Sequence, residues 1–392
     1  MVDPEALIED LQRFVRCPSV TGGERAMAEL FASRAEALGL EAEVVEFDLD
    51  AVRRAPGYPG EEAPRTELVG AVAVRRGSHP GTPRLAFNGH IDVVNEGGED
   101  WVHAPWSGDR FEGFVYGRGS VDMKAGVAAA LHAAAAVESP RGDVVVVATP
   151  SEEDGGLGTF AALERDSDFA GCLIPEPTAF ELICAQAGAL TFAGVVPGKA
   201  AHAALRLEGE SAIDRYVPFH LALHEHERAL NAGVAHPLMR AHELPYPLLV
   251  GRVAGGRWSS QVPDRLEFEG RLGVPIGTPV EEARAALDEL AARHGIELSW
   301  TGGQFAPADT DPRHPFIRAV AAAAAEELGN EPPLAGATYG SDMRLWAERG
   351  IPCAMLGPGG IERAHGVDER VAEDDVVQTA RILERVARGL GA

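Results

Sequence analysis

The stretch DVVVVATP, residues 143–150, contains a continuous run of β-branched valines at 144–147. Such runs are typical of a strand that is buried on both faces, as in a parallel sheet. It follows DMKAGVAAALHAAAAV, residues 122–137, an alanine-rich segment that predicts a helix beginning at Asp122. A further apolar strand is expected at 84–89. A helix between two buried strands indicates an α/β sheet with helices on its faces.

The pattern changes in the middle of the chain and then returns. From about 189 the segments TFAGVVPG, PLLVGRVAGG and RLEFEGRLGVP are typical of half-buried strands, and they are separated by helical segments. The 392 residues exceed the usual length of one domain. We therefore expect an α/β catalytic domain formed by residues 1–188 and 303–392, with an α+β domain, residues 189–302, inserted between its two parts.

Composition excludes several classes of partner. Sixty acidic residues against 35 basic ones give a net charge of −25, which disfavours binding to nucleic acid and to anionic membrane surfaces. No stretch approaches 18 uninterrupted apolar residues, and the N-terminal segment lacks the features of a signal peptide. The four cysteines form no CxxC pair, which is typical of free thiols in a reducing compartment. These features predict a soluble, cytoplasmic protein.

The stretch LAFNGHIDVV, residues 85–94, places a histidine and an aspartate at the end of an apolar strand. Residues two apart in a strand project from the same face, so His90 and Asp92 point the same way. An imidazole can donate one N–H to a carboxylate while its other nitrogen binds a metal or a substrate. A purely structural His–Asp hydrogen bond is the alternative that this motif alone leaves open.

Other polar residues also follow apolar strands or glycine-rich turns. They are Asp122, the adjacent Glu152 and Glu153, Glu176, and His365. Helix capping would explain the first of them, and a solvated loop position would explain any other taken alone. Ligands bind at the carboxyl ends of strands in open α/β sheets, where several such residues converge. Two histidines with three carboxylates are what two borderline divalent ions such as zinc require.

These residues carry a family resemblance. The stretches GHIDVV, GRGSVDMKAG, SEED, PEPT and AHGVDE stand in the order, and at roughly the spacings, of the M20 metallopeptidase family of co-catalytic dizinc amidohydrolases. The chain resembles this family over nearly its whole length. It is most similar to the branch with acetylornithine deacetylase, succinyl-diaminopimelate desuccinylase, aminoacylases and glutamate carboxypeptidase. The resemblance implies a mostly parallel-sheet catalytic domain with an inserted lid and dimerisation domain.

The resemblance also implies a role for each residue of the site. It assigns His90 and Glu176 to one metal ion, Glu153 and His365 to the other, and Asp122 to both as a bridge. Asp92 is expected to orient His90, and Glu152 is expected to be the general base, which takes a proton from water and delivers it to the leaving amine. Related enzymes carry a cis peptide after the bridging aspartate, so one is expected between Asp122 and Met123.

The inserted domain carries a further candidate. The stretch GKAAHAALRLEGESAI resembles the family's lid segment, whose histidine reaches the active site, usually that of the partner subunit, and stabilises the oxyanion. This assigns that role to His202 and implies a homodimer. Three other histidines, His220, His224 and His226, lie on a predicted helix, where packing or solvated roles are expected. A zinc site built from that HxxxHxH cluster is an alternative.

Residues that bind the substrate depart from the family pattern. In SSQVPDRLEFEGR, Gln261 stands where the family usually has asparagine, and Arg271 follows the Val-Pro pair at a shorter spacing than usual. A guanidinium matches the two oxygens of a carboxylate, so Arg271 is a candidate for the substrate's carboxylate. Arg265 and Arg344 are alternatives for this role.

We therefore expect a metal-dependent hydrolase that cleaves the amide bond of an N-acyl amino acid or a related N-acyl amine, with two Zn²⁺ ions for which Co²⁺ can substitute. The glutamate of PEPT favours this branch over the di- and tripeptidases, which tend to have aspartate there. A dipeptidase or carboxypeptidase acting on short peptides is the alternative. A non-catalytic metal-binding relative is a third, but such a protein has no need of a proton-transfer carboxylate at Glu152.

Overall fold

The computed structural model describes residues 1–79, 81–98 and 100–389. Its internal contacts divide the chain into two compact units. The first unit comprises Met1–Cys184, Asp309–Ala335 and Ser341–Ala392, and the second unit comprises Ala185–Ala308 and Gly336–Gly340. Among the described helices, none is long and apolar enough to cross a membrane.

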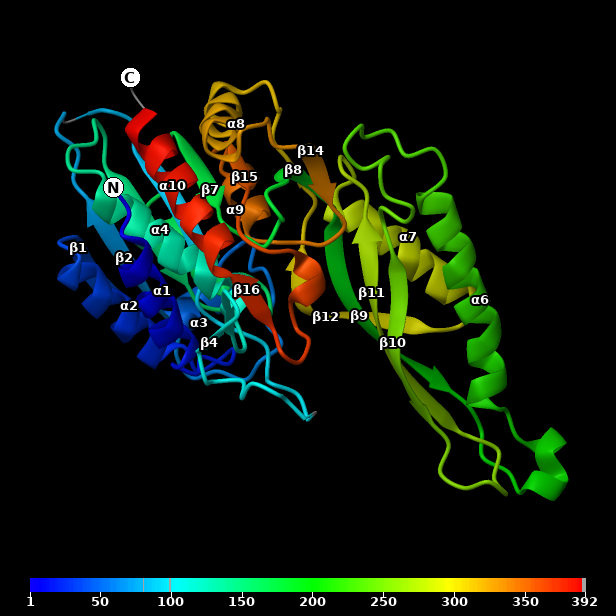
Figure 1. The fold of residues 1–392 in the computed structure, drawn as a ribbon. Coiled ribbons are helices and arrows are strands. Elements are labelled where there is room, and N and C mark those ends of the chain that lie inside the picture. The colour runs from blue at the N-terminus through cyan, green and yellow to red at the C-terminus, as the bar shows by residue number, and fades with distance from the viewer. Residues whose placement is uncertain (80, 99, 390–392) are drawn as a thin grey trace. The chain divides into compact units, whose positions relative to one another are not determined.

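A nine-stranded sheet is the centre of the first unit (Figure 1). Its strands, in spatial order, are β1 (Glu41–Glu46), β2 (Val69–Arg75), β6 (Val144–Thr149), β3 (Leu85–His90), β7 (Gly171–Ile174), β15 (Cys353–Met355), β8 (Leu182–Gln186) and β13 (Ala308–Asp309), with β14 (Leu334–Ala337) paired to β8. The four central strands from β6 to β15 run parallel, and their outer neighbours β2 and β8 pair antiparallel to them. This confirms the expected α/β fold with a mostly parallel central sheet.

The strands β3 and β6 explain why the candidate residues meet. Every residue of both strands is buried, as continuous apolar runs predict. Their parallel register pairs Leu85 with Val144 at one end and His90 with Thr149 at the other. Because parallel strands end at the same edge of a sheet, His90 lies beside the turn that carries Glu152.

Helices cover the sheet, and the alanine-rich helix lies in the middle of their packing. The helices of the first unit are α1 (Pro4–Val15), α2 (Arg25–Ala37), α3 (Leu49–Arg54), α4 (Ala125–Ala136), α5 (Leu157–Arg165), α8 (Pro315–Leu328), α9 (Met343–Glu348) and α10 (Glu373–Gly389). Residues 125–134 of α4 are all buried, because α4 packs on β3 and β6 on one side and on α1 and α10 on the other. Alanine side chains allow this close approach.

A small three-stranded sheet joins two segments that are far apart in the sequence. Its strands are β4 (Asp109–Phe111), β5 (Phe114–Tyr116) and β16 (Arg370–Ala372), with β5 in the centre. The pairing of β16 with β5 brings the segment just before β16, which contains His365, next to the turn that follows β5 and contains Asp122.

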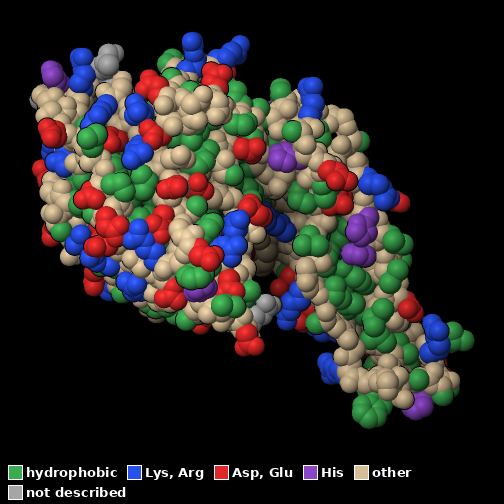
Figure 2. All heavy atoms as spheres, in the orientation of Figure 1, with side chains coloured by type: hydrophobic (Ala, Val, Ile, Leu, Met, Phe, Trp, Pro, Cys, Tyr) green, Lys and Arg blue, Asp and Glu red, His purple; other side chains and the backbone are tan. Residues whose placement is uncertain are grey.

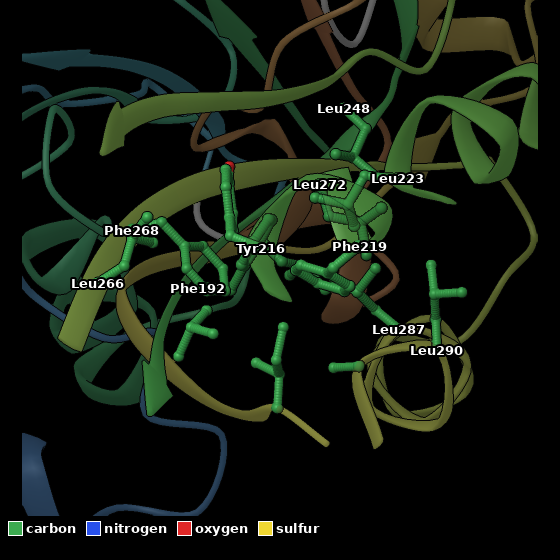
Figure 3. Packing of buried hydrophobic residues seen from close by; sticks show 14 of the residues in the cluster. Phe192, Tyr216, Phe219, Leu223, Leu248, Leu266, Phe268, Leu272, Leu287 and Leu290 are labelled. Atoms are coloured by element: carbon green, nitrogen blue, oxygen red, sulfur yellow. The ribbon is translucent and has the colours of Figure 1, made fainter. Parts of the chain in front are cut away.

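The second unit is an antiparallel sheet covered by helices. The strand order is β10 (Leu248–Gly255), β11 (Arg265–Val274), β9 (Gly188–Pro197) and β12 (Glu297–Phe305), so β10 and β12 are the edges. The helices α6 (Ala212–Leu230) and α7 (Val280–Arg293) contribute to the same core as the strands. Figure 3 shows Phe192 and Phe268 of the sheet facing Phe219 of α6 and Leu287 of α7.

The four cysteines are free thiols, as expected, and three of them are buried. Cys172 on β7 and Cys353 on β15 pair in the register of the parallel sheet. Burial, together with a hydrogen bond to Cys353, raises the pKa of the Cys172 thiol well above its usual value, so this thiol is unreactive at neutral pH.

Candidate metal centre

His90 is the last residue of β3, and its side chain is almost fully buried. Its Nδ1 lies 2.8 Å from the backbone carbonyl oxygen of Asp92, which can only accept a hydrogen bond. Nδ1 therefore carries the proton, and Nε2 presents its lone pair. That Nε2 atom lies 3.0 Å from Asp122 Oδ1 and 3.8 Å from Glu176 Oε1. The ring is oriented as a metal ligand requires.

The carboxylate of Asp92 was expected to orient the His90 ring, but it forms its hydrogen bonds elsewhere. It lies 3.7 Å from His90 Nδ1, farther than the carbonyl of the same residue. Its oxygens instead accept hydrogen bonds from the backbone N–H groups of Glu152 at 3.1 Å and Glu153 at 3.2 Å, and from the hydroxyl of Thr21 at 3.0 Å. Asp92 thus fixes the turn that carries the two glutamates, and it orients His90 through its backbone.

Asp122 lies between the two histidines. It belongs to a distorted turn, Ser120–Lys124, and the peptide bond between Asp122 and Met123 is cis, as expected. Its Oδ1 faces His90, and its Oδ2 lies 3.4 Å from Nε2 of His365. Burial alone would raise the pKa of Asp122, but the hydrogen bonds with His365 and His90 outweigh it and lower the pKa below its usual range. This carboxylate is ionised and has one oxygen for each histidine.

Glu153 and His365 complete the second side of the cluster. Nε2 of His365 lies 3.2 Å from Glu153 Oε2, and the His365 side chain is 52% exposed, so the cluster opens to solvent at this point. Hydrogen bonds to Asp122 and Glu153 raise the pKa of His365 to about 10, which shows how strongly the surrounding carboxylates favour positive charge.

The donor set fits metal ions of the zinc type. One ligand atom from each of His90, Asp122 and Glu153 lies within 4.8 Å of the others. Burial raises the pKa of the Glu152 and Glu176 carboxyl groups well above their usual values, because a charged carboxylate is costly in a buried pocket. Imidazole nitrogen and carboxylate oxygen are the ligands that borderline divalent ions prefer.

Comparison with known proteins agrees with this geometry. The model of peptidase family M20/M25/M40 matches residues 86–389. The chain belongs to this family. It is 31% identical over 408 residues to a succinyl-diaminopimelate desuccinylase of Methylobacterium radiotolerans, covering 98% of this chain and 96% of the relative. It is 30% identical over 362 residues to an acetylornithine deacetylase of Myxococcus xanthus, covering 90% and 89%.

A solved structure shares the fold of this M20 chain. It is a dinuclear metal-binding peptidase of family M20 from Bacillus subtilis, which is similar with a TM-score of 0.65 at 16% sequence identity. The similarity covers 98% of this chain and 97% of that chain. The match to the family model and the similarity to the two relatives confirm the expected family, and with it the class of metal-dependent hydrolase.

A buried ion pair that sequence reasoning missed holds the two loops of this M20 site together. Glu369 accepts hydrogen bonds from the backbone N–H groups of Val121 at 2.9 Å and Asp122 at 3.2 Å. Its other oxygen accepts from Nη1 of Arg118 at 2.7 Å, and Nη2 of Arg118 donates to the backbone carbonyl of His365 at 3.1 Å. Glu369 therefore fixes the backbone of Asp122 directly and that of His365 through Arg118.

Replacing Glu369 with glutamine is expected to lower metal affinity or activity by about 10- to 100-fold, as changes to groups that orient metal ligands typically do. The amide keeps an acceptor for the backbone N–H groups, but Arg118 loses its buried carboxylate partner. Metal titration followed by steady-state kinetics checks this expectation. Glu373→Gln is the matched control, because Glu373 pairs with Arg110 outside this network. If Glu369→Gln and Glu373→Gln lost metal affinity and activity to the same extent, Glu369 would have no special role at the site.

Arg344 is occupied within the first unit, against its expected role as a carboxylate-binding group. Its side chain is 1% exposed, and its guanidinium donates to the backbone carbonyls of Ser341 at 2.9 Å and Gly155 at 2.7 Å. These bonds fix the turn after Glu152, and the burial leaves no surface for a substrate. We do not retain Arg344 as a substrate-binding residue.

The second unit holds the remaining candidates. His202 is exposed, and its backbone forms an antiparallel bridge with Gln261. Its Nδ1 accepts a hydrogen bond from the backbone N–H of Ala204 at 3.1 Å, which assigns the ring proton to Nε2. Arg265 and Arg271 are both exposed on β11, and Arg265 forms an ion pair with Glu267 at 2.7 Å.

Proposed function

We propose that this protein hydrolyses the amide bond of an N-acyl amino acid or a related N-acyl amine and releases the free amine. The observation that carries the proposal is the position of Asp122 between His90 and His365, in the same cluster as a pair of adjacent glutamates. The relatives at about 30% identity are named as a desuccinylase and a deacetylase of N-acylated amino acids, which supports the acyl specificity.

We propose that two divalent ions, Zn²⁺ with Co²⁺ as a substitute, occupy the centre. His90 and Glu176 would hold one, Glu153 and His365 would hold the other, and Asp122 would contact both. When bound, the ions would supply Lewis-acid polarisation of the scissile carbonyl and acidify water.

In this proposal Glu152 moves the proton. Burial raises the pKa of the Glu152 carboxyl group, which makes its carboxylate a stronger base than a solvated one. Glu152 accepts a proton as the water oxygen bonds to the amide carbon. It then donates this proton to the amide nitrogen as the carbon–nitrogen bond breaks. The amine leaves neutral, and the acyl group leaves as a carboxylic acid.

We further propose that the active form is a homodimer joined through the second unit. The edge strand β10 exposes Leu249 and Val253, and one face of α6 exposes Ile213, Val217 and Leu221. Figure 2 shows hydrophobic side chains gathered over β10 and α6. An exposed strand edge beside apolar surface favours pairing with a second copy around a twofold axis.

In this dimer His202 would serve the partner's centre. Its Nε2–H is a donor on an exposed side chain, suited to bind the oxyanion that forms during attack. Arg271 and Gln261 would contact the substrate's carboxylate and carbonyl. The free thiols of all four cysteines support a cytoplasmic location.

Mixing two inactive variants is expected to restore activity. Glu152→Gln subunits keep His202, and His202→Ala subunits keep Glu152. A mixed dimer therefore has one intact shared site. Random pairing is expected to return about a quarter of the wild-type sites. Activity of the mixture, with subunit exchange verified by mass measurement of tagged chains, is the readout. Exchange without any recovered activity would contradict the shared site.

A panel of substrates tests the proposed function. Metal-loaded protein is assayed against N-succinyl, N-acetyl and N-formyl amino acids and against a set of dipeptides. We expect kcat/KM to be highest for N-acyl amino acids. A preference for dipeptides would instead assign the protein to the peptidases of the family, and no turnover of any amide would contradict both.

A further inference from the structure

The helix α6 of the second unit carries two histidines with facing ring nitrogens. His220 and His224 are four residues apart, a spacing that places both side chains on one face of a helix. Their Nε2 atoms lie 3.2 Å apart, with the ring planes inclined at 75°. His224 is exposed and His220 is partly exposed.

Tyr216, one turn before His220, orients this pair. Its hydroxyl oxygen lies 3.3 Å from Nδ1 of His220, and the two rings stack. The tyrosine ring is held in the core against Phe219 and Phe268, and Figure 3 shows its hydroxyl pointing away from the other labelled side chains. When His220 donates its Nδ1–H to this hydroxyl, its Nε2 presents a lone pair. Metal-binding histidines commonly have such a partner for their other ring nitrogen.

The distance between the two nitrogens suits ligands of one ion. Two imidazole nitrogens at about 2.0–2.1 Å from a tetrahedral zinc ion are roughly 3.3 Å apart. A direct hydrogen bond between two neutral imidazoles would give a similar separation. However, an exposed pair gains little from that bond, because water satisfies the same groups.

We propose that His220 and His224 form a site for a divalent transition metal such as Cu²⁺, Ni²⁺ or Zn²⁺, separate from the centre in the first unit. Imidazole nitrogen is a preferred ligand of all three ions, and water would fill the remaining positions. His226 takes no part, because a spacing of two residues places it on another face of the helix, where it is half-buried. Of the three histidines in the HxxxHxH cluster, only His220 and His224 would therefore bind the ion.

Copper binding tests this site. Protein reconstituted with zinc is titrated with Cu²⁺, and bound copper is measured by elemental analysis and by electron paramagnetic resonance. The wild type is compared with a His220→Gln/His224→Gln variant and with His226→Gln as the control on the same helix. Copper that replaces zinc in the first unit contributes equally in all three proteins, so it does not affect the difference in bound copper between them. Circular dichroism verifies that all three proteins are folded.

We expect the wild type and His226→Gln to bind one more equivalent of copper per chain than the double variant. The electron paramagnetic resonance spectrum of this additional copper is expected to show hyperfine splitting from two imidazole nitrogens. Each single variant, His220→Gln or His224→Gln, is expected to lose that spectrum. Equal copper binding and equal spectra in the wild type and the double variant would overturn the proposal. Copper binding and the copper spectrum do not depend on turnover, so this test is independent of the proposed function.

Discussion

Replacing Glu152 with glutamine is expected to lower kcat by about 10²- to 10⁴-fold, the usual contribution of a general acid–base group. Glutamine has nearly the same shape but cannot accept the proton that the water must lose. The change leaves the five proposed ligands in place, so metal content is expected to stay unchanged. The measurement is steady-state turnover of the best N-acyl substrate, together with the metal content of both proteins.

The control for this variant is Glu36→Gln, which changes an exposed glutamate on α2. It is expected to retain wild-type activity. If Glu152→Gln kept more than a tenth of the wild-type kcat at full metal content, another group would be the base. A loss of metal together with activity would instead indicate that Glu152 is a ligand.

Removing the metal ions is expected to abolish turnover and to lower thermal stability. Without counter-charge, Asp122, Glu153 and Glu176 repel one another in a largely buried pocket. Ions present at about 100 times their dissociation constant would stabilise the folded chain by about 2.7 kcal/mol. For a chain of this size, that corresponds to a melting temperature higher by roughly 3 °C.

Differential scanning calorimetry of chelated and reloaded protein measures the stability effect, and turnover is assayed on the same samples. Reloading with Zn²⁺ or Co²⁺ is expected to restore both properties, which controls for irreversible damage by the chelator. Full turnover after exhaustive chelation would contradict a metal-dependent mechanism.

The sequence was informative where function depends on strand ends. Continuous apolar runs such as 143–150 predicted buried parallel strands, and parallel strands end at one edge of a sheet. The same reasoning predicts that His90 lies near Glu153, and the short distances among these residues and Asp122 agree with it. The cis peptide after Asp122 could be expected only from the family resemblance.

Groups that orient the ligands could not be found in this way. Glu369 contacts the backbone of Asp122 across 247 positions of sequence, and no local periodicity encodes such a contact. The sequence does show that Glu369 belongs to the motif AHGVDE, which also contains His365, and this proximity could have pointed to Glu369. Similarly, the motif GSDMR shows an arginine at position 344 but not its burial, and that burial removes Arg344 from the substrate-binding candidates.

Strand β12 shows a limit of the pattern analysis in the second unit. Its residues, Glu297–Phe305, include two glycines and several polar side chains, which weaken the alternation expected of a strand. It forms an edge by pairing with β9, with an irregularity between Trp300 and Gln304. Pairing with a neighbouring strand, rather than local propensity, determines its conformation.

Anomalous diffraction from crystals of the zinc-loaded protein, recorded on both sides of the zinc absorption edge, tests the central claim most directly. The account predicts two zinc peaks in the cluster, with Asp122 contacting both, His90 and Glu176 on one, and Glu153 and His365 on the other. A single peak, or two peaks that do not share Asp122, would contradict it.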